Sequence, residues 1–157
     1  VLEVGPGRFI AESNAILCYL AEGTIYMPAD PFERAKVMQW LFFEQYSHEP
    51  NVATARFWLG WLKPAPTPYY VEGLARKQEA GRAALQVMET HLAAHPFFVG
   101  DRYTIADIAL YAYTHVAPEG GFDLSPYPGV GAWLDRVRRQ PGHVELSHYP
   151  PSVNVVD

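Results

Sequence analysis

The chain has 157 residues, which suits one domain or one domain with part of another. Apolar residues make up 49% of it, enough for a sizeable core, and charged residues only 18%, which argues against a disordered or coiled-coil chain. The formal net charge is −5 and no run of Lys or Arg occurs, so no nucleic-acid partner is expected. No segment approaches the roughly 20 apolar residues of a membrane span, and the single Cys18 permits no intramolecular disulfide.

The sequence begins with a predicted β-hairpin followed by a helix. Residues 1–4 and 8–10 are β-prone, and a Gly-Pro-Gly turn signal lies between them. Residues 12–20 then show the apolar face of a helix. The first residues have the composition of an interior strand and lack an initiator Met, so we expect the chain to begin partway through a domain.

A linker at residues 24–30 separates this start, residues 1–23, from a helical region at 31–157. Asp30 can cap the first helix of that region, and Glu33 is placed to complete a capping box.

About five helices are predicted in the helical region. The first runs past residue 44, is interrupted at Pro50 and resumes at 51–62. The helix that starts at Thr104 is apolar nearly all round, which predicts a central, buried position. Further helices are expected at residues 70–94 and 130–139, with loops at 64–68 and 118–129.

Thr104 and Asp107 have the spacing of a capping box. The Thr hydroxyl can accept from the third N–H of the helix, while the Asp carboxylate reaches back to the Thr N–H. Tyr103 and Ile108 are spaced for the accompanying hydrophobic contact. We therefore interpret this pair as a folding element and not as a catalytic dyad.

The order of elements and two motifs resemble the glutathione transferase family of cytosolic, bacterial type. The segments FIAESNAIL at residues 9–17 and FVGDRYTIAD at residues 98–107 carry the resemblance, and residues 127–134 extend it. It implies a mainly α fold, with an all-helical C-terminal domain preceded by a ββα remnant of a thioredoxin-like domain.

The acidic-Ser pair Glu12 and Ser13 matches the glutathione site of that family. Ser13 would lie in the first turn of a helix, where free N–H groups suit an anion such as the γ-glutamyl carboxylate. Glu12 offers a negative charge to the neighbouring α-ammonium. The resemblance implies glutathione as co-substrate, and the alternative is that either side chain merely caps the helix.

Tyr46, His48 and Arg56 lie on the interrupted helix, where the family has walls of its electrophile pocket. The resemblance implies that they contact a small electrophilic substrate, and the alternative is that they are exposed polar side chains. No metal site is expected, because His48 lacks the second His of a zinc-protease motif and three later residues lack a shared helical face: His143, Glu145 and His148.

The resemblance implies a cytoplasmic, homodimeric subunit that conjugates glutathione to small electrophiles. The activating Tyr, Ser or Cys of the family, and its cis-proline, would precede Val1, so no catalytic residue is assigned and this chain alone is expected to be inactive. Similar helical domains also act as docking pieces in translation assemblies, so a non-catalytic protein-interaction module is the alternative. Retention of Glu12 and Ser13 favours the enzyme.

Overall fold

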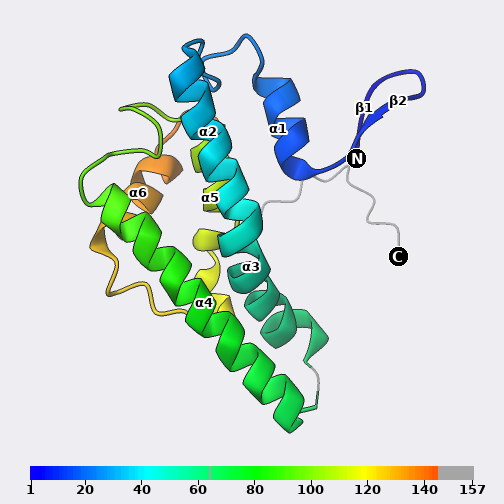
Figure 1. The fold of residues 1–157 in the computed structure, drawn as a ribbon, viewed down its shortest axis with the longest axis vertical. Coiled ribbons are helices and arrows are strands. Elements are labelled where there is room, and N and C mark those ends of the chain that lie inside the picture. The colour runs from blue at the N-terminus through cyan, green and yellow to red at the C-terminus, as the bar shows by residue number, and fades with distance from the viewer. Residues whose placement is uncertain (64, 145–157) are drawn as a thin grey trace.

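The computed structural model describes residues 1–63 and 65–144, which form a mainly helical fold with a small hairpin at its start (Figure 1). The strands are β1 (Leu2–Gly5) and β2 (Arg8–Ile10), and the α-helices are α1 (Ser13–Ala21), α2 (Pro31–Phe43), α3 (Glu49–Phe57), α4 (Pro68–Leu92), α5 (Ile105–Thr114) and α6 (Pro128–Arg138). Two π-helical segments, η1 (Glu44–His48) and η2 (Trp58–Leu62), and a 3-10 helix, η3 (Ala117–Gly120), complete the order. The predicted fold class is confirmed, and the domain boundaries at residues 23 and 30 stay a prediction.

The hairpin projects away from the helices in Figure 1. Its strands pair antiparallel, with Leu2 opposite Ile10 and Glu3 opposite Phe9. Gly7 in the turn has a φ of 70°, a conformation that side chains rarely adopt, so the turn favours glycine there. Within the described residues the sheet has these two strands only.

The break predicted at Pro50 is wrong. The chain runs from α2 through η1 into α3 as one continuous rod (Figure 1), because a π-turn widens the helix just before the proline. The N–H of Glu49 donates to the Glu44 carbonyl, one residue further back than in an α-helix. The Asn51 side chain donates to the Ser47 carbonyl at 2.7 Å, which satisfies an acceptor within the widened turn.

The long helix α4 packs against α3 and α6. It begins two residues before the predicted start, because the Thr67 hydroxyl accepts from the N–H of Tyr70 and caps it. Gly81 of α4 is buried against the Phe122 ring, and a Cβ there would lie 2.5 Å from that ring. The close approach of α4 to the segment after η3 therefore depends on a glycine.

Asp30 caps α2 as predicted, since its carboxylate accepts from the N–H of Glu33 at 2.9 Å. The Glu33 carboxylate does not complete the capping box, because it pairs with the guanidinium of Arg102 at the entry to α5. The helix start is thus tied to a distant segment.

The helix α5 is central, as its sequence predicts, and it packs against α1, α2, α3 and α6. Residues on several of its sides are buried, among them Ile105, Ala106 and Leu110. They join one continuous core with α4 and α6. No helix within the described residues is both long and apolar enough to cross a membrane.

Candidate functional site

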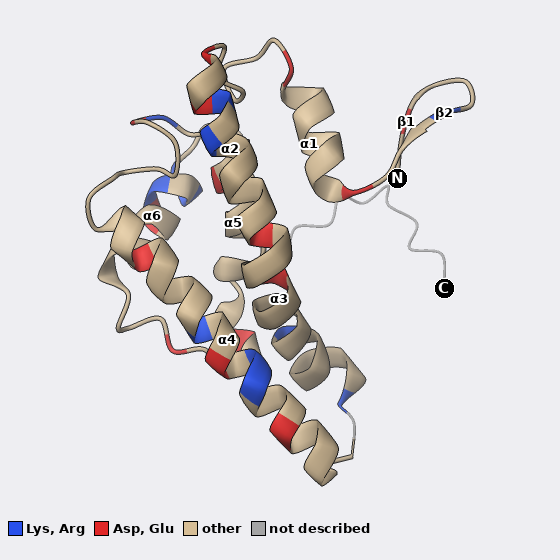
Figure 2. Cartoon of the chain, in the orientation of Figure 1, with Lys and Arg blue, Asp and Glu red and all other residues tan. Residues whose placement is uncertain are grey.

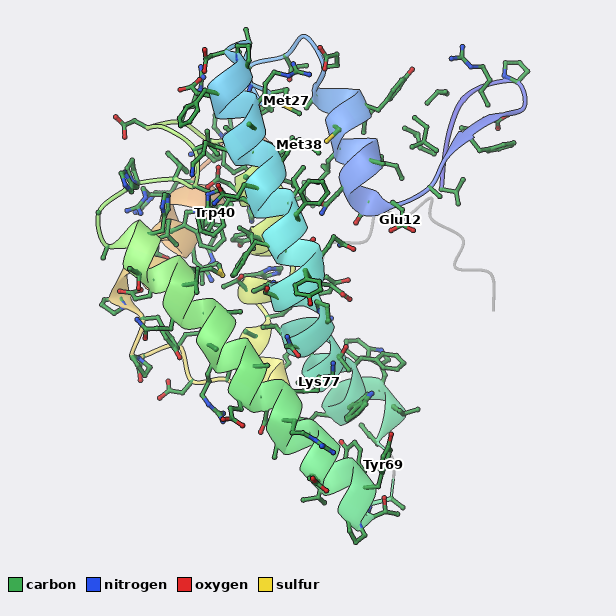
Figure 3. The ribbon with its side chains drawn as sticks, viewed as in Figure 1. Glu12, Met27, Met38, Trp40, Tyr69 and Lys77 are labelled. Carbon is green, nitrogen blue, oxygen red and sulfur yellow. The ribbon has the colours of Figure 1, made fainter. Side chains whose placement is uncertain are left out.

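The start of α1 is uncapped and strained. Glu12 precedes the helix with φ 70° and ψ 120°, a conformation uncommon for a residue other than glycine. In the described part of the chain, no side chain caps this helix, and both Glu12 and Ser13 are exposed. Figure 3 shows Glu12 at the point where the chain enters α1 from the hairpin. The alternative that one of these side chains caps the helix is therefore contradicted.

Backbone strain of this kind costs roughly 1–3 kcal/mol and persists only where the surrounding structure holds it in place. Strained residues are concentrated at active sites and ligand sites. The Glu12 carbonyl accepts from the N–H of Ile16 at 3.0 Å, so the helical ladder begins at the strained residue. The earlier N–H groups of the first turn, together with the Ser13 hydroxyl, are available to an anion.

A buried polar contact ties this helix start to the helical region. The Asn14 side chain donates to the Leu41 carbonyl at 3.2 Å and to Oε2 of Glu44 at 3.0 Å. Glu44 is only 3% exposed, and its carboxylate also accepts from the Gln45 amide at 2.8 Å. Burial raises the pKa of Glu44, and the hydrogen bonds from Gln45 and Asn14 oppose that rise. The sequence analysis did not predict the contact between Asn14 and Glu44. The one signal for it in the sequence was an amide side chain directly after the acidic-Ser pair.

A cavity of about 420 Å³ opens beside α3. It is lined by seven residues from α3, η2 and α5: Glu49, Ala53, Thr54, Arg56, Phe57, Trp61 and Tyr113. The Arg56 guanidinium pairs with Glu119 at 2.7 Å and lies 4.4 Å from the centre of the Trp61 ring. One of the three predicted pocket residues is thus at a cavity.

Tyr46 and His48 do not line that cavity. The Tyr46 side chain is 87% exposed, so its contact with a substrate stays a prediction. His48 is 0% exposed and therefore forms no pocket wall in this structure. The physical reason is that Tyr46 and His48 belong to the π-turn, where Tyr46 points to solvent and His48 into the core.

His48 joins η1 to α5. The Thr114 hydroxyl donates to the Leu110 carbonyl at 2.6 Å, so it must accept from Nε2–H of His48 at 3.0 Å. Burial lowers the pKa of His48 to about 4, which keeps the ring neutral at physiological pH. Its contacts are those of a structural histidine.

Thr104 and Asp107 form the predicted capping box. Oδ2 of Asp107 accepts from the Thr104 N–H at 2.9 Å and from its hydroxyl at 3.1 Å. Oδ1 accepts from the N–H of Phe98 at 3.2 Å and from the Trp133 indole at 2.9 Å. Burial raises the pKa of Asp107 against these four hydrogen bonds. The bonds from Phe98 and Trp133 tie two other segments to the start of α5, as expected for a folding element.

The thiol of Cys18 lies in α1 and is partly buried. The Cys18 thiol donates to the Met38 sulfur at 3.9 Å, and burial raises its pKa, so it is a poor nucleophile.

In residues 1–63 and 65–144, no group of three or more His, Cys, Asp or Glu residues could hold a metal ion. Glu145 and His148 lie outside the described residues. Figure 2 shows acidic and basic residues alternating along α4.

The family model and the solved structure that match this chain name the same family. A family model described as "Glutathione S-transferase, C-terminal domain" matches residues 52–141. A crystal structure of a glutathione S-transferase from Pseudomonas fluorescens is 50% identical, with a TM-score of 0.85 over 88% of this chain and 68% of that one. The disulfide-bond oxidoreductase YfcG of Escherichia coli K12 is 33% identical over 138 residues, which are 87% of this chain and 62% of its own length.

A region of elongation factor 1-gamma from Artemia salina is also similar, at 34% identity over 124 residues, 74% of this chain. The match takes up 27% of that protein's length. The chain thus spans less than two thirds of either of these two curated relatives.

Proposed function

This chain belongs to the glutathione S-transferase family, and we propose that it acts in a subunit that binds glutathione at the start of α1 and conjugates it to small electrophiles. The observation that carries the proposal is the strained, uncapped entry to α1, where Glu12 and Ser13 are both exposed and bond to no other described side chain. By contrast, side chains accept from the first-turn N–H groups of α2, α4 and α6.

Each residue has a chemical role in this proposal. The Ser13 hydroxyl and the first-turn N–H groups bind the γ-glutamyl carboxylate, and the Glu12 carboxylate binds the α-ammonium. The glutathione sulfur then attacks the electrophilic carbon as a thiolate, and the leaving group departs with its electron pair. A free thiol has a pKa of about 8.5, so a group that favours the thiolate is required. We propose that it belongs to the segment preceding Val1.

We further propose a cytoplasmic homodimer. The α2 helix carries apolar side chains that this chain leaves exposed, among them Phe32 at 73% and Phe42 at 66%. A second copy packed on this face would remove them from water. Light scattering of the parent and of Phe42→Glu tests this, and a parent that is monomeric at tens of micromolar would contradict it.

The test of the function uses the protein expressed from its complete coding sequence. Titration calorimetry should detect glutathione binding, and Ser13→Ala should weaken it by about 1–3 kcal/mol because charged ligand atoms lose a partner. Glu12→Gln should weaken it as well. Ser125→Ala, which removes a hydroxyl from an exposed loop, is the matched control and should bind normally. Unchanged affinity in both site variants would overturn the assignment.

The reaction is tested separately from binding. An aryl halide reports conjugation, and a mixed disulfide reports the thiol–disulfide chemistry named for YfcG. Turnover of the aryl halide supports conjugation, and turnover of the disulfide alone would replace it with an oxidoreductase function at the same site.

A non-catalytic interaction module is the second candidate. The similarity to part of elongation factor 1-gamma favours it, because the matched region is a small share of that protein. A folded protein that binds no glutathione, with or without Ser13, would support this alternative over the enzyme.

A further inference from the structure

We infer that the end of the molecule where η2 turns into α4 docks on the surface of a membrane that contains anionic phospholipid. Exposed apolar side chains gather at this end, together with basic groups that no described carboxylate neutralises. The inference is independent of the proposed glutathione site, which lies at the start of α1.

We call residues 57–63 and 65–71 the helical tip. It lies at the lower end of Figure 1, opposite the end where α1 passes into α2. The Trp58 ring joins its two sides, since it lies 5.4 Å from the Tyr70 ring and a Cβ added at Gly73 would approach it to 3.3 Å. The tip is therefore held together by its inner aromatic side chains, and its other side chains face outward.

Six large apolar side chains of the tip are exposed. Trp61 is 59% exposed and Tyr69 is 81% exposed, and Figure 3 shows Tyr69 at the start of α4. Large exposed apolar patches mark sites of interaction with proteins or membranes. Trp and Tyr favour the boundary between hydrocarbon and water, where the ring is buried and the N–H or O–H stays hydrated. The six side chains are those of Phe57, Leu59, Trp61, Leu62, Tyr69 and Val71.

The tip is an acid-free part of an acidic chain. The chain has a formal net charge of −5, yet the sequence from Phe57 to Val71 contains no Asp or Glu and has one basic residue, Lys63. The face that we propose for a second copy lies on α2 and includes none of these residues. The composition of the tip therefore matches a partner that is apolar inside and negatively charged at its surface.

The charges just behind the tip agree with such a partner. Arg76 pairs with Glu72 at 3.4 Å, so these two charges offset each other. Lys63 and Lys77 make no ion pair with a described carboxylate, and Lys77 lies about two helical turns behind Tyr69 on α4 (Figure 3). A lysine stem can lie along apolar surface while its ammonium group reaches a lipid phosphate. Each basic residue near an anionic leaflet adds to the attraction.

Sedimentation with lipid vesicles tests the inference on the protein expressed from the complete coding sequence. The protein should bind vesicles of mixed phosphatidylcholine and phosphatidylglycerol, with a partition coefficient about tenfold higher than for phosphatidylcholine alone. High salt should reduce this preference, because it screens the lysines from the headgroups.

Two variants of the tip separate the apolar contribution from the charge. Leu62→Ser should lower the partition coefficient about tenfold on both kinds of vesicle, because the apolar side chain no longer enters the lipid. Lys63→Gln should lower it about fivefold on the mixed vesicles only. Ile25→Ser is the matched control, since it removes an isomeric side chain that is 78% exposed at the opposite end of the molecule, and it should bind like the parent. Circular dichroism confirms that each variant folds.

Three outcomes would overturn the inference: no sedimentation of the parent, equal sedimentation of the parent and Leu62→Ser, or equal sedimentation of the parent with both kinds of vesicle. Light scattering without vesicles adds a fourth. If Leu62→Ser changes the size of the particle, the tip is a contact between copies of the chain and not a membrane site. None of these measurements involves glutathione, so each outcome leaves the proposed function standing.

Discussion

Two helices of this chain begin with one acidic and one hydroxyl-bearing residue, and they use the pair in opposite ways. At the start of α5, Thr104 and Asp107 are buried and bond to each other as a capping box. At the start of α1, Glu12 and Ser13 are exposed, and neither caps the helix. The composition of the two helix starts is similar, and their hydrogen bonding is not.

The difference distinguishes a folding element from the proposed binding site. The α5 start satisfies its own donors and those of distant segments, so nothing remains for a ligand. The α1 start holds a strained residue and leaves donors open, and we propose that these donors bind glutathione. Variants at the two sites should therefore affect different properties.

The largest effect is expected from Asp107→Ala. It leaves four buried donors without an acceptor, among them the Phe98 N–H and the Trp133 indole, and should lower the free energy of unfolding by roughly 3–5 kcal/mol. Urea denaturation measures it. Any folded fraction should still bind glutathione normally, so loss of affinity with retained stability would contradict the comparison.

A matched pair of hydroxyl deletions compares the two helix starts directly. Thr104→Ala removes a buried cap and should cost about 1–2 kcal/mol. Ser13→Ala removes a hydroxyl that caps nothing and should change stability by less than about 0.5 kcal/mol while weakening glutathione binding. Equal shifts of the denaturation midpoint in the two variants, relative to the parent, would show that both hydroxyls serve the fold.

The sequence predicted the α5 start more completely than the α1 start, for a physical reason. A capping box lies within four residues, so its spacing is visible in the sequence. The left-handed φ of Glu12 falls on a residue other than glycine, so no local pattern reports it. The Asn14–Glu44 contact joins residues 30 apart, and the Phe98 and Trp133 donors reach Asp107 from other segments, so their combined effect on stability could not be predicted either.

The pocket shows the same limit. Arg56 was predicted from its place on the interrupted helix and lines the cavity, whereas Tyr46 and His48 fall in the π-turn and do not. A proline marks a disturbed helix in a sequence, but it does not reveal whether the helix ends or widens. Tyr113 and Glu49 reach the cavity from separate elements and carried no signal of their own.

Relief of strain should separate stability from binding at the α1 start. Glu12→Gly allows the φ of 70° without strain and should raise the free energy of unfolding by about 0.5–1 kcal/mol, even after the entropy cost of glycine. Glutathione affinity should fall because the carboxylate is lost. The neighbouring Ala11→Gly is the control, since Ala11 has an ordinary φ, and it should not gain stability. Equal behaviour of the two variants would mean that Glu12 is unstrained in solution.

The smallest effect concerns Glu44, the buried carboxylate that accepts a hydrogen bond from Asn14 in the first turn of α1. Burial raises its pKa above the usual 4.5, so the folded state holds the proton more tightly than the unfolded state. The contribution of Glu44 to stability is therefore complete below pH 4.5 and is lost as the pH rises through the folded-state pKa.

Glu44→Gln keeps an oxygen in place to accept from Asn14 and Gln45 and removes the charge. Relative to the parent, this variant should gain stability as the pH rises from 4 to 7, by less than about 1 kcal/mol, and then reach a plateau. Glu22→Gln should show a pH dependence of stability of the opposite sign. Arg34 lowers the pKa of Glu22, so the stability that this carboxylate contributes is lost as the pH falls. Urea midpoints of the parent and both variants across this range decide the matter. A difference between Glu44→Gln and the parent that stays constant with pH would mean that the Glu44 carboxylate is solvated, and that Asn14 positions the α1 start without a buried charge beneath it.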